Sequence, residues 1–393
     1  MRYFSAKAKE IKASLLIVVF MPSLDIAMPT TLLTVVVATL FLNERVEPKL
    51  KATFEDREFR TRDVVLLVGM VAIVVSVIAY TSLLNPGQFF QNFLLTIFLF
   101  SYSVLLFTFA HIFSKMQKKK AQLLSLGYAI ASMTAAATSF LEPLADSWTF
   151  YRAGAFFGLA AFSFCAIILA QKKADQKERL YLSIQPPAFF VLLFIFYNLL
   201  YAGKAQVWDP ILMDIYGIAF AVLIILYLGS MFTWKTAVIF AVLLTVVDII
   251  LVLGTRTMIE AANRFTGTGL PVLVYLPNIP LIPVPPDYQF RSFFGFHDNG
   301  LGLGDFFFAG VIAIQTLKRF DKKTAYISVV AMMTSFAVFL AFMRELVNLL
   351  EPLIGTGIAG FPGTLMIICG WLVVVALKLF YERRNKNNKI SRV

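Results

Sequence analysis

The sequence predicts an all-α, polytopic membrane protein, and three observations lead to this fold class. Hydrophobic residues fill 59% of the 393 positions and charged residues 15%, and the mean hydropathy is +0.78. Apolar stretches of about twenty residues recur along the chain, each long enough to cross a hydrocarbon layer of roughly 30 Å as a helix. Backbone amides in lipid need partners within their own segment, which favours helices over open strands. We therefore expect an integral, multi-pass protein embedded in a lipid bilayer.

The apolar stretches give eleven candidate spans. The first is irregular, because Pro22, Asp25 and Pro29 fall in its middle, where proline bends a helix. Basic residues precede it, as in a signal peptide, but no convincing cleavage site follows, so we expect it to be retained. The expected spans lie near residues 14–43, 64–84, 89–114, 121–143, 153–171, 180–201, 211–232, 235–254, 301–318, 324–345 and 357–382.

Lysine and arginine collect in alternate connections between these spans. The connections on one side hold 24 of them and those on the other side hold five. Cytoplasmic loops carry the excess of positive charge, so the C-terminus is predicted to be cytoplasmic and the 255–300 loop to lie on the opposite side. The four basic residues before the first span do not fit this alternation. The net charge of +12 suits loops that face anionic lipid and implies no nucleic-acid partner.

Metal and nucleophile chemistry has few candidate residues in this chain. Cys165 and Cys369 lie in apolar spans, where a thiol behaves as a small hydrophobic group. Two histidines, His111 and His297, are too few for most metal centres or for a histidine-based triad. We therefore predict no metal and no cofactor.

Two carboxylates fall at the same predicted depth in the membrane. Asp248 is 12 residues from Thr236 at the cytoplasmic start of its span, and Asp305 is 12 residues from Leu317 at the cytoplasmic end of the next. At about 1.5 Å per residue, both lie roughly 18 Å above the inner face. A charge at mid-span costs about 2.5 to 3.5 kcal/mol on insertion scales, so the pair needs a functional reason. Facing carboxylates can share a proton, and one can activate water while the other polarises a peptide carbonyl.

The residues before Asp305 alternate glycine and leucine from Gly300 to Gly304. A period of two favours an extended segment whose bare backbone can approach another backbone, such as an unwound transmembrane substrate. Tight helix packing is the alternative explanation for these glycines. The other charged residues in the spans are expected to be interfacial, solvated or in a polar gap: Asp25, Asp214, Arg344 and Glu345.

The segments "VVDIILVLGTRTMIEAANRF", "LPVLVYLP" and "GLGDFFFAGVIAIQTLKRFD" resemble, in order and spacing, the catalytic core of the intramembrane aspartyl proteases that include presenilin and signal peptide peptidase. The resemblance covers residues 211–382. It implies that Asp248 and Asp305 are the catalytic pair. It also implies a presenilin-like nine-helix core in residues 85–393, with residues 1–84 as an N-terminal transmembrane addition.

The chain departs from the family pattern at two places. Val247 stands where the family has a tyrosine before its first aspartate, and "GFPGTL" stands in place of a Pro-Ala-Leu motif on the last helix. Thr364 in place of leucine puts the packing of that motif in doubt. The 255–300 loop is rich in proline and is expected to face substrate, with its "VLVY" segment pairing with an unwound substrate or lying static at the interface. The predicted substrate-binding residues are Gly302, Leu303, Gly304, Val272, Leu273, Val274, Pro362, Gly363, Thr364 and Leu365.

The predicted activity is hydrolysis of peptide bonds in transmembrane segments. The charge-derived orientation is similar to that of signal peptide peptidase, which favours substrates with a cytoplasmic N-terminus, such as signal-peptide remnants. Partner subunits are not implied. A proton-coupled transporter or ion pathway also explains a facing aspartate pair, but not the ordered family resemblance. A non-catalytic relative that binds transmembrane helices is the third alternative.

Overall fold

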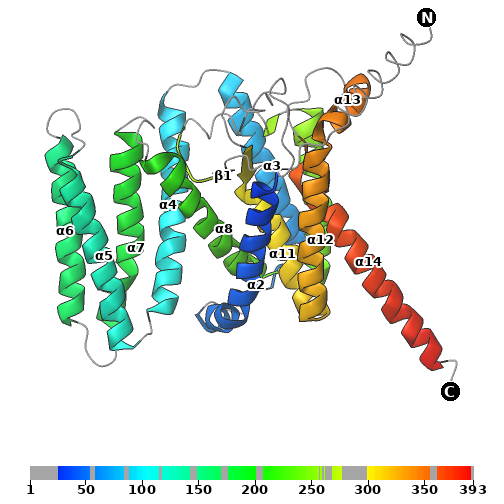
Figure 1. Cartoon of the computed structure of the whole chain (residues 1–393), viewed down its shortest axis with the longest axis horizontal. Coiled ribbons are helices and arrows are strands. Elements are labelled where there is room, and N and C mark those ends of the chain that lie inside the picture. Colours follow the sequence, from blue (N-terminus) through cyan, green and yellow to red (C-terminus); the bar gives the residue numbers. More distant parts are fainter. Residues whose placement is uncertain are drawn as a thin grey trace, which may run out of the picture.

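The computed structural model describes residues 25–53, 58–83, 88–114, 117–141, 148–169, 176–200, 207–255, 257–258, 261, 268–276, 299–354 and 361–390. Figure 1 shows a bundle of helices with one small sheet, β1 and β2. Eight helices in the described residues are long and apolar enough to cross a membrane. The chain is thus an all-α protein of the multi-pass membrane type, as the sequence predicts.

The elements follow the chain in a simple order. Three helices contain or adjoin a π-helical segment, labelled η. The elements are α2 (Ala27–Thr53), α3 (Thr61–Leu83), α4 (Gln88–Phe113), α5 (Lys118–Thr138), α6 (Trp148–Leu169), α7 (Gln176–Leu193), η1 (Phe194–Leu199), η2 (Val207–Leu212), α8 (Met213–Gly229), α9 (Trp234–Ile249), η3 (Ile250–Gly254), β1 (Leu273–Leu276), β2 (Asn299–Gly302), α11 (Leu303–Arg319), α12 (Lys322–Ala341), α13 (Met343–Ile354) and α14 (Gly363–Ile390).

Each expected span from residue 64 onward overlaps one of these helices, but the first is displaced. Helix α2 begins at Ala27, and Asp25 accepts a hydrogen bond of 3.0 Å from the Ala27 backbone N–H. Pro29 then falls in the first turn, where its missing N–H would have had no helical partner. The earlier part of the expected span, residues 14–24, lies outside the described residues. The proline and aspartate therefore mark a helix start and not the middle of a span.

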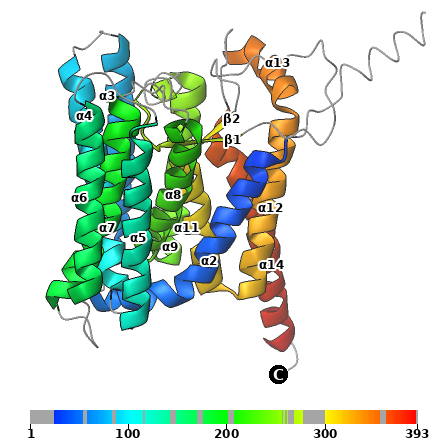
Figure 2. The ribbon, with the colours of Figure 1, turned by 60° about the vertical axis from the view of Figure 1, so that its left-hand side comes forward.

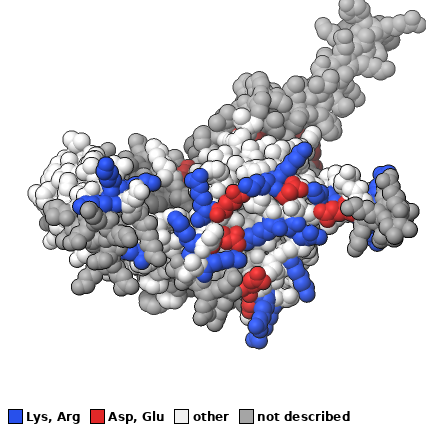
Figure 3. Space-filling model, turned by 90° about the horizontal axis from the view of Figure 1, so that it is seen from below, with Lys and Arg blue, Asp and Glu red and all other residues white. Residues whose placement is uncertain are grey.

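Helix α2 also continues past its expected end at residue 43, because its last turns carry charges that pair with other helices. Glu47 accepts from Lys318 of α11 at 2.7 Å, and Glu44 pairs with Lys322 of α12 at 2.5 Å. Figure 3, which views the molecule from below, shows Lys, Arg, Asp and Glu side chains gathered on this end of the bundle. We call this the basic end. The C-terminus and the turn between α11 and α12 lie at this end (Figure 1).

Helix α11 lies at the centre of the bundle. It packs against α2, α8, α9, α12 and α14, and its residues 308–316 are all buried. Figures 1 and 2 show α5, α6 and α7 grouped to one side, where α7 contacts α4. Helix α3 packs against α9. The helices that carry Asp248 and Asp305 are therefore held on several sides by the rest of the chain.

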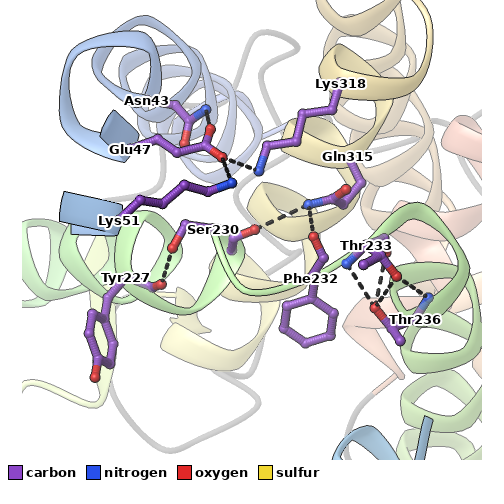
Figure 4. A network of polar contacts seen from close by, with 11 residues as sticks. Asn43, Glu47, Lys51, Tyr227, Ser230, Phe232, Thr233, Thr236, Gln315 and Lys318 are labelled. Atoms are coloured by element: carbon purple, nitrogen blue, oxygen red, sulfur yellow. Dashed lines mark hydrogen bonds and ion pairs between the residues drawn. The ribbon is translucent and has the colours of Figure 1, made fainter. Parts of the chain in front are cut away.

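A buried glutamine fixes α11 against the turn between α8 and α9. The Gln315 side-chain amide donates to the backbone oxygens of Gly229 at 3.2 Å and Phe232 at 2.7 Å (Figure 4). The same turn starts α9 with a capping box between Thr233 and Thr236. The basic end of α11 is thus bonded to the turn from which α9 begins. Because α9 begins and α11 ends at one level, equal numbers of residues along them lead to similar heights for Asp248 and Asp305.

At the basic end, Asp321 caps α12 and pairs with α14. Its carboxylate accepts from the Thr324 backbone N–H at 2.7 Å and from Lys378 Nζ at 2.9 Å. The hydrogen bond from Lys378, followed by that from the Thr324 backbone N–H, lowers the pKa of Asp321 from 3.8 to about 2. A lowered pKa in the folded state means that this contribution to stability is complete above pH 3.8 and is lost as the pH falls through about 2.

We expect Asp321→Ala to lower the melting temperature at pH 7, and the difference from the wild type to narrow as the pH falls towards 2. Asp321→Asn keeps an acceptor for the Thr324 N–H but loses the ion pair, so its melting temperature at pH 7 should lie between the two. Thermal unfolding in detergent at several pH values measures this. A difference between Asp321→Ala and the wild type that does not change with pH would contradict the assignment.

Candidate active site

Asp305 lies at the junction between strand β2 and helix α11. The glycine and leucine alternation predicts an extended segment, and the chain is a strand up to Gly302 and a helix from Leu303. Gly302 is the N-cap residue, and its backbone N–H donates to the carboxylate of Asp305, the third residue of the first turn. A carboxylate in this turn also faces the positive end of the helix dipole. The predicted extended segment therefore ends at Gly302, two residues earlier than expected, and Gly304 and Asp305 both lie in the first turn of α11.

Asp248 lies in the last turn of α9, immediately before the π-helical segment η3. Its Oδ2 accepts two hydrogen bonds from Thr364 at the start of α14, 2.6 Å from the side-chain hydroxyl and 3.2 Å from the backbone N–H. The neighbouring Gly363 lies against Asp305, because a Cβ at Gly363 would be 2.8 Å from Asp305 Cγ. Two consecutive residues of α14 therefore touch the two aspartates.

The two carboxylates come from α9 and α11, converge on the first turn of α14 and interact electrostatically. Both are half-buried. Gly304, beside Asp305, is exposed, and a Cβ there would meet no atom within 4 Å. The residue next to Asp305 in the chain therefore has room for a neighbouring group. Val247, the residue that departs from the family pattern, is half-buried.

The "GFPGTL" motif is part of this arrangement. Pro362 precedes α14 and is buried, and its carbonyl accepts from the Met366 N–H at 3.3 Å. Thr364 is 4% exposed and is bonded to Asp248, so the threonine contributes a polar contact where leucine would contribute only packing. Leu365 is half-buried and packs against the hydrophobic core. The doubt that the sequence raised about Thr364 concerned packing, and the sequence carried no sign of its hydrogen bond.

Strands β1 and β2 form an antiparallel pair directly above the aspartates. Leu273 lies opposite Gly302, Val274 opposite Leu301, and Tyr275 opposite Gly300. The "VLVY" segment therefore pairs with the "GLG" segment of the same chain. The Tyr275 ring covers Gly300, where an added Cβ would lie 3.0 Å from Tyr275 Cε1.

The outer edge of β1 is occupied by helix α8. The Tyr275 backbone N–H donates to Asp214 Oδ1 at 2.7 Å. Val274 is fully buried, with its Cγ2 3.0 Å from where a Cβ of Gly217 would lie. Val274 is among the predicted substrate contacts, but its side chain has no exposed surface in this structure. Val272 and Leu273 are half-buried.

The edge of β2 that faces away from β1 carries backbone groups of the glycines. Leu303 donates to the Val272 carbonyl at 3.0 Å, which marks these two residues as a hydrogen-bonded pair. In an antiparallel ladder such pairs alternate, so the backbone polar groups of Gly300 and Gly302 point away from β1. Gly302 uses its N–H for Asp305. Both polar groups of Gly300 are directed to the second edge, whereas the carbonyl of Gly302, the N-cap residue, faces the first turn of α11.

The turn before β1 is anchored by three side chains from other helices. Tyr102 of α4 donates to the Pro271 carbonyl at 3.3 Å, and Trp208 of η2 donates to the Gly269 carbonyl at 2.9 Å. Asn198 of η1 donates to the Thr268 carbonyl at 2.8 Å. Gly269 has φ +64°, a left-handed conformation that favours glycine. The hairpin is thus held in place from the side of α4, α7 and α8.

No protein-family model, curated protein or solved structure matches the chain.

The part of the 255–300 loop that carries most of its prolines, residues 277–298, lies outside the described residues. Within the described residues, no group of three or more His, Cys, Asp or Glu side chains could hold a metal ion. Cys165 is exposed, Cys369 is half-buried, and both are free. The polar groups that the described residues bring together here are the two carboxylates, the Thr364 hydroxyl and the backbone groups of the half-buried Gly300.

Asp214 is expected to hold β1 in position. Asp214→Ala removes the acceptor of the Tyr275 N–H, and a buried amide without a partner costs about 1 to 3 kcal/mol. We expect faster hydrogen exchange at the Tyr275 amide and lower order in the hairpin. Asp214→Asn retains a carbonyl oxygen and is the matched control that should exchange slowly. Equal exchange rates in the two variants would contradict this role.

Proposed function

We propose that the protein is an intramembrane aspartyl protease of the presenilin and signal peptide peptidase type, which hydrolyses peptide bonds of transmembrane segments. The observation that carries the proposal is the convergence of Asp248 and Asp305 on the first turn of α14, beside the exposed Gly304. Two neighbouring carboxylates at the predicted depth inside the membrane can act as a general acid and a general base. The strand edge next to them supplies the means to hold an extended substrate.

In the proposed reaction, the pair holds one negative charge and one proton. The ionised aspartate takes a proton from water as the water oxygen attacks the peptide carbonyl carbon, and the protonated aspartate donates to the carbonyl oxygen. In the second step, the aspartate that took the water proton donates it to the peptide nitrogen. The other aspartate takes a proton from a hydroxyl of the tetrahedral intermediate as the C–N bond breaks and the new carboxylic acid forms. Each aspartate thereby returns to its starting protonation state, and no covalent intermediate is formed.

The substrate is proposed to add as a strand to the edge of β2 that does not pair with β1. Both edges of β1 are engaged, by β2 and by Asp214, so Val272, Leu273 and Val274 support the β2 strand in this proposal. Strand β2 runs towards Asp305, and an antiparallel partner would place its N-terminal end at the aspartates. If the basic end is cytoplasmic, such a substrate has a cytoplasmic N-terminus, as signal-peptide remnants do.

A presenilin-like core in this proposal consists of nine helices of the described residues: α4, α5, α6, α7, α8, α9, α11, α12 and α14. Residues 1–84 are then an addition that braces the core. The contacts of α2 with α8, α11 and α12, and of α3 with α9, support this role. The addition would stabilise both helices that carry an aspartate.

Cleavage of a transmembrane reporter peptide by the purified protein tests the proposal. The peptide is incorporated with the protein in lipid vesicles, and its fragments are identified by mass spectrometry. Asp248→Asn and Asp305→Asn are the test variants, and Asp214→Asn is the matched control for removing a charge near the site. A proton pathway would give proton flux into the vesicles without fragments, so a pH-sensitive dye is read in the same preparation. Proton flux without cleavage would refute the protease proposal.

A further inference from the structure

The Thr364 hydroxyl donates to an aspartate on a different helix. Thr245 and Thr316, two buried threonines in helix interiors, donate to the carbonyl four residues earlier, to Ala241 at 2.8 Å and to Ile312 at 2.6 Å. Buried Thr324, in the first turn of α12, donates to its own N-cap residue Asp321 at 3.0 Å. Thr364 is the second residue of α14, so no helical carbonyl precedes it at that distance. Its hydroxyl donates to Asp248 Oδ2 at 2.6 Å instead.

Two donors from one residue bind the same carboxylate oxygen. The Thr364 hydroxyl and backbone N–H both reach Oδ2 of Asp248, which leaves Oδ1 without either bond. Hydrogen bonds to a charged acceptor are among the stronger ones in proteins, and two of them resist rotation of the carboxylate about its Cβ–Cγ bond. The plane of the Asp248 carboxylate is therefore set by α14.

We propose that Thr364 is a positioning residue for Asp248, which directs the Oδ1 atom towards the water that attacks the substrate. The inference rests on the proposed protease function. Gly363 complements it, because the missing Cβ leaves the space that Asp305 occupies. Residues 363 and 364 together then set the relative geometry of the two carboxylates. The threonine replaces the packing role of the family's leucine with a direct hydrogen bond to the catalytic pair.

Kinetics of three proteins test the positioning role. Thr364→Val keeps the shape of the side chain and removes the hydroxyl, and it should lower kcat about 10- to 100-fold with KM changed less than about twofold. Thr364→Ser keeps the hydroxyl and loses the methyl group, and it should restore kcat to within about threefold of the wild type. Wild-type kcat in Thr364→Val, or equally low kcat in both variants, would overturn the proposal. The second outcome would show that the methyl group and its packing matter instead.

An infrared measurement tests the hydrogen bond without any turnover. Difference spectra between the wild type and Asp248→Asn isolate the carboxyl bands of Asp248. Thr364→Val should shift these bands, and Thr364→Ser should return them to their wild-type positions. Unchanged bands in Thr364→Val would refute the inference whether or not the protein cleaves peptides. Shifted bands in a protein that cleaves no reporter would instead support the Asp248 contact and count against the protease function.

Discussion

Asp248→Asn and Asp305→Asn are each expected to lower the rate of peptide cleavage at least about 10⁴-fold. Asparagine has nearly the shape of aspartate, but it can neither accept the proton of the attacking water nor donate one to the carbonyl oxygen. The two aspartates act as a unit, so either replacement should cost nearly as much as both, and the double variant should be no slower than the single ones within error.

These variants should fold as well as the wild type. Each replacement removes a charge that is costly at mid-membrane, so the melting temperature should be unchanged or higher. Loss of cleavage with a retained melting temperature separates a chemical effect from an unfolding effect. Substantial cleavage by either variant would exclude the acid-base mechanism, even if the fold is correct.

Gly363→Ala should be the most damaging of the glycine replacements around the site. An added Cβ would lie 2.5 Å from Asp305 Oδ1 and 2.8 Å from Asp305 Cγ, closer than carbon and oxygen atoms approach without a shift. Either the Asp305 side chain or the start of α14 must move. Displacing catalytic groups by about 1 Å can cost on the order of 100-fold in rate, and we expect a loss of that size in kcat.

This result would be informative because alanine is the residue that the family motif has at this position. The matched control is Gly254→Ala at the end of η3, in the continuation of the helix that carries Asp248, where a Cβ would meet no atom within 4 Å. It should retain activity and melting temperature. Wild-type kcat in Gly363→Ala would show that the space around Asp305 is wider than the contacts indicate.

The proximity of the two aspartates could be predicted because helix geometry converts residue counts into distance along each helix. That conversion needs both helices to end at the same level, and Gln315 and the Thr233 capping box provide this. The approximate positions of the apolar helices from α3 onward could be predicted from the length of the apolar stretches. The start of α2 was misplaced because a proline in a first turn and a proline in mid-helix look alike in a composition window.

The remaining parts of the site depend on contacts between distant segments. Thr364 and Asp248 are 116 positions apart, and no local pattern links a threonine to an aspartate across that separation. The register of β1 with β2 is similarly hidden, because residues 277–298 separate the strands, and a connection of this length is not a short hairpin turn that would fix the register. Asp214 was expected to be solvated or capped, and its bond to the Tyr275 N–H depends on the fold of the hairpin.

The contact of α14 with both aspartates also has a consequence for biosynthesis. Asp248 and Asp305 enter the membrane on earlier helices, and the Gly363 and Thr364 contacts form only after the last helix of the described chain has been inserted. A partly synthesised chain would therefore carry both carboxylates without their final arrangement. The order of synthesis therefore delays the final arrangement of the aspartate pair until α14 has joined the helices that surround it.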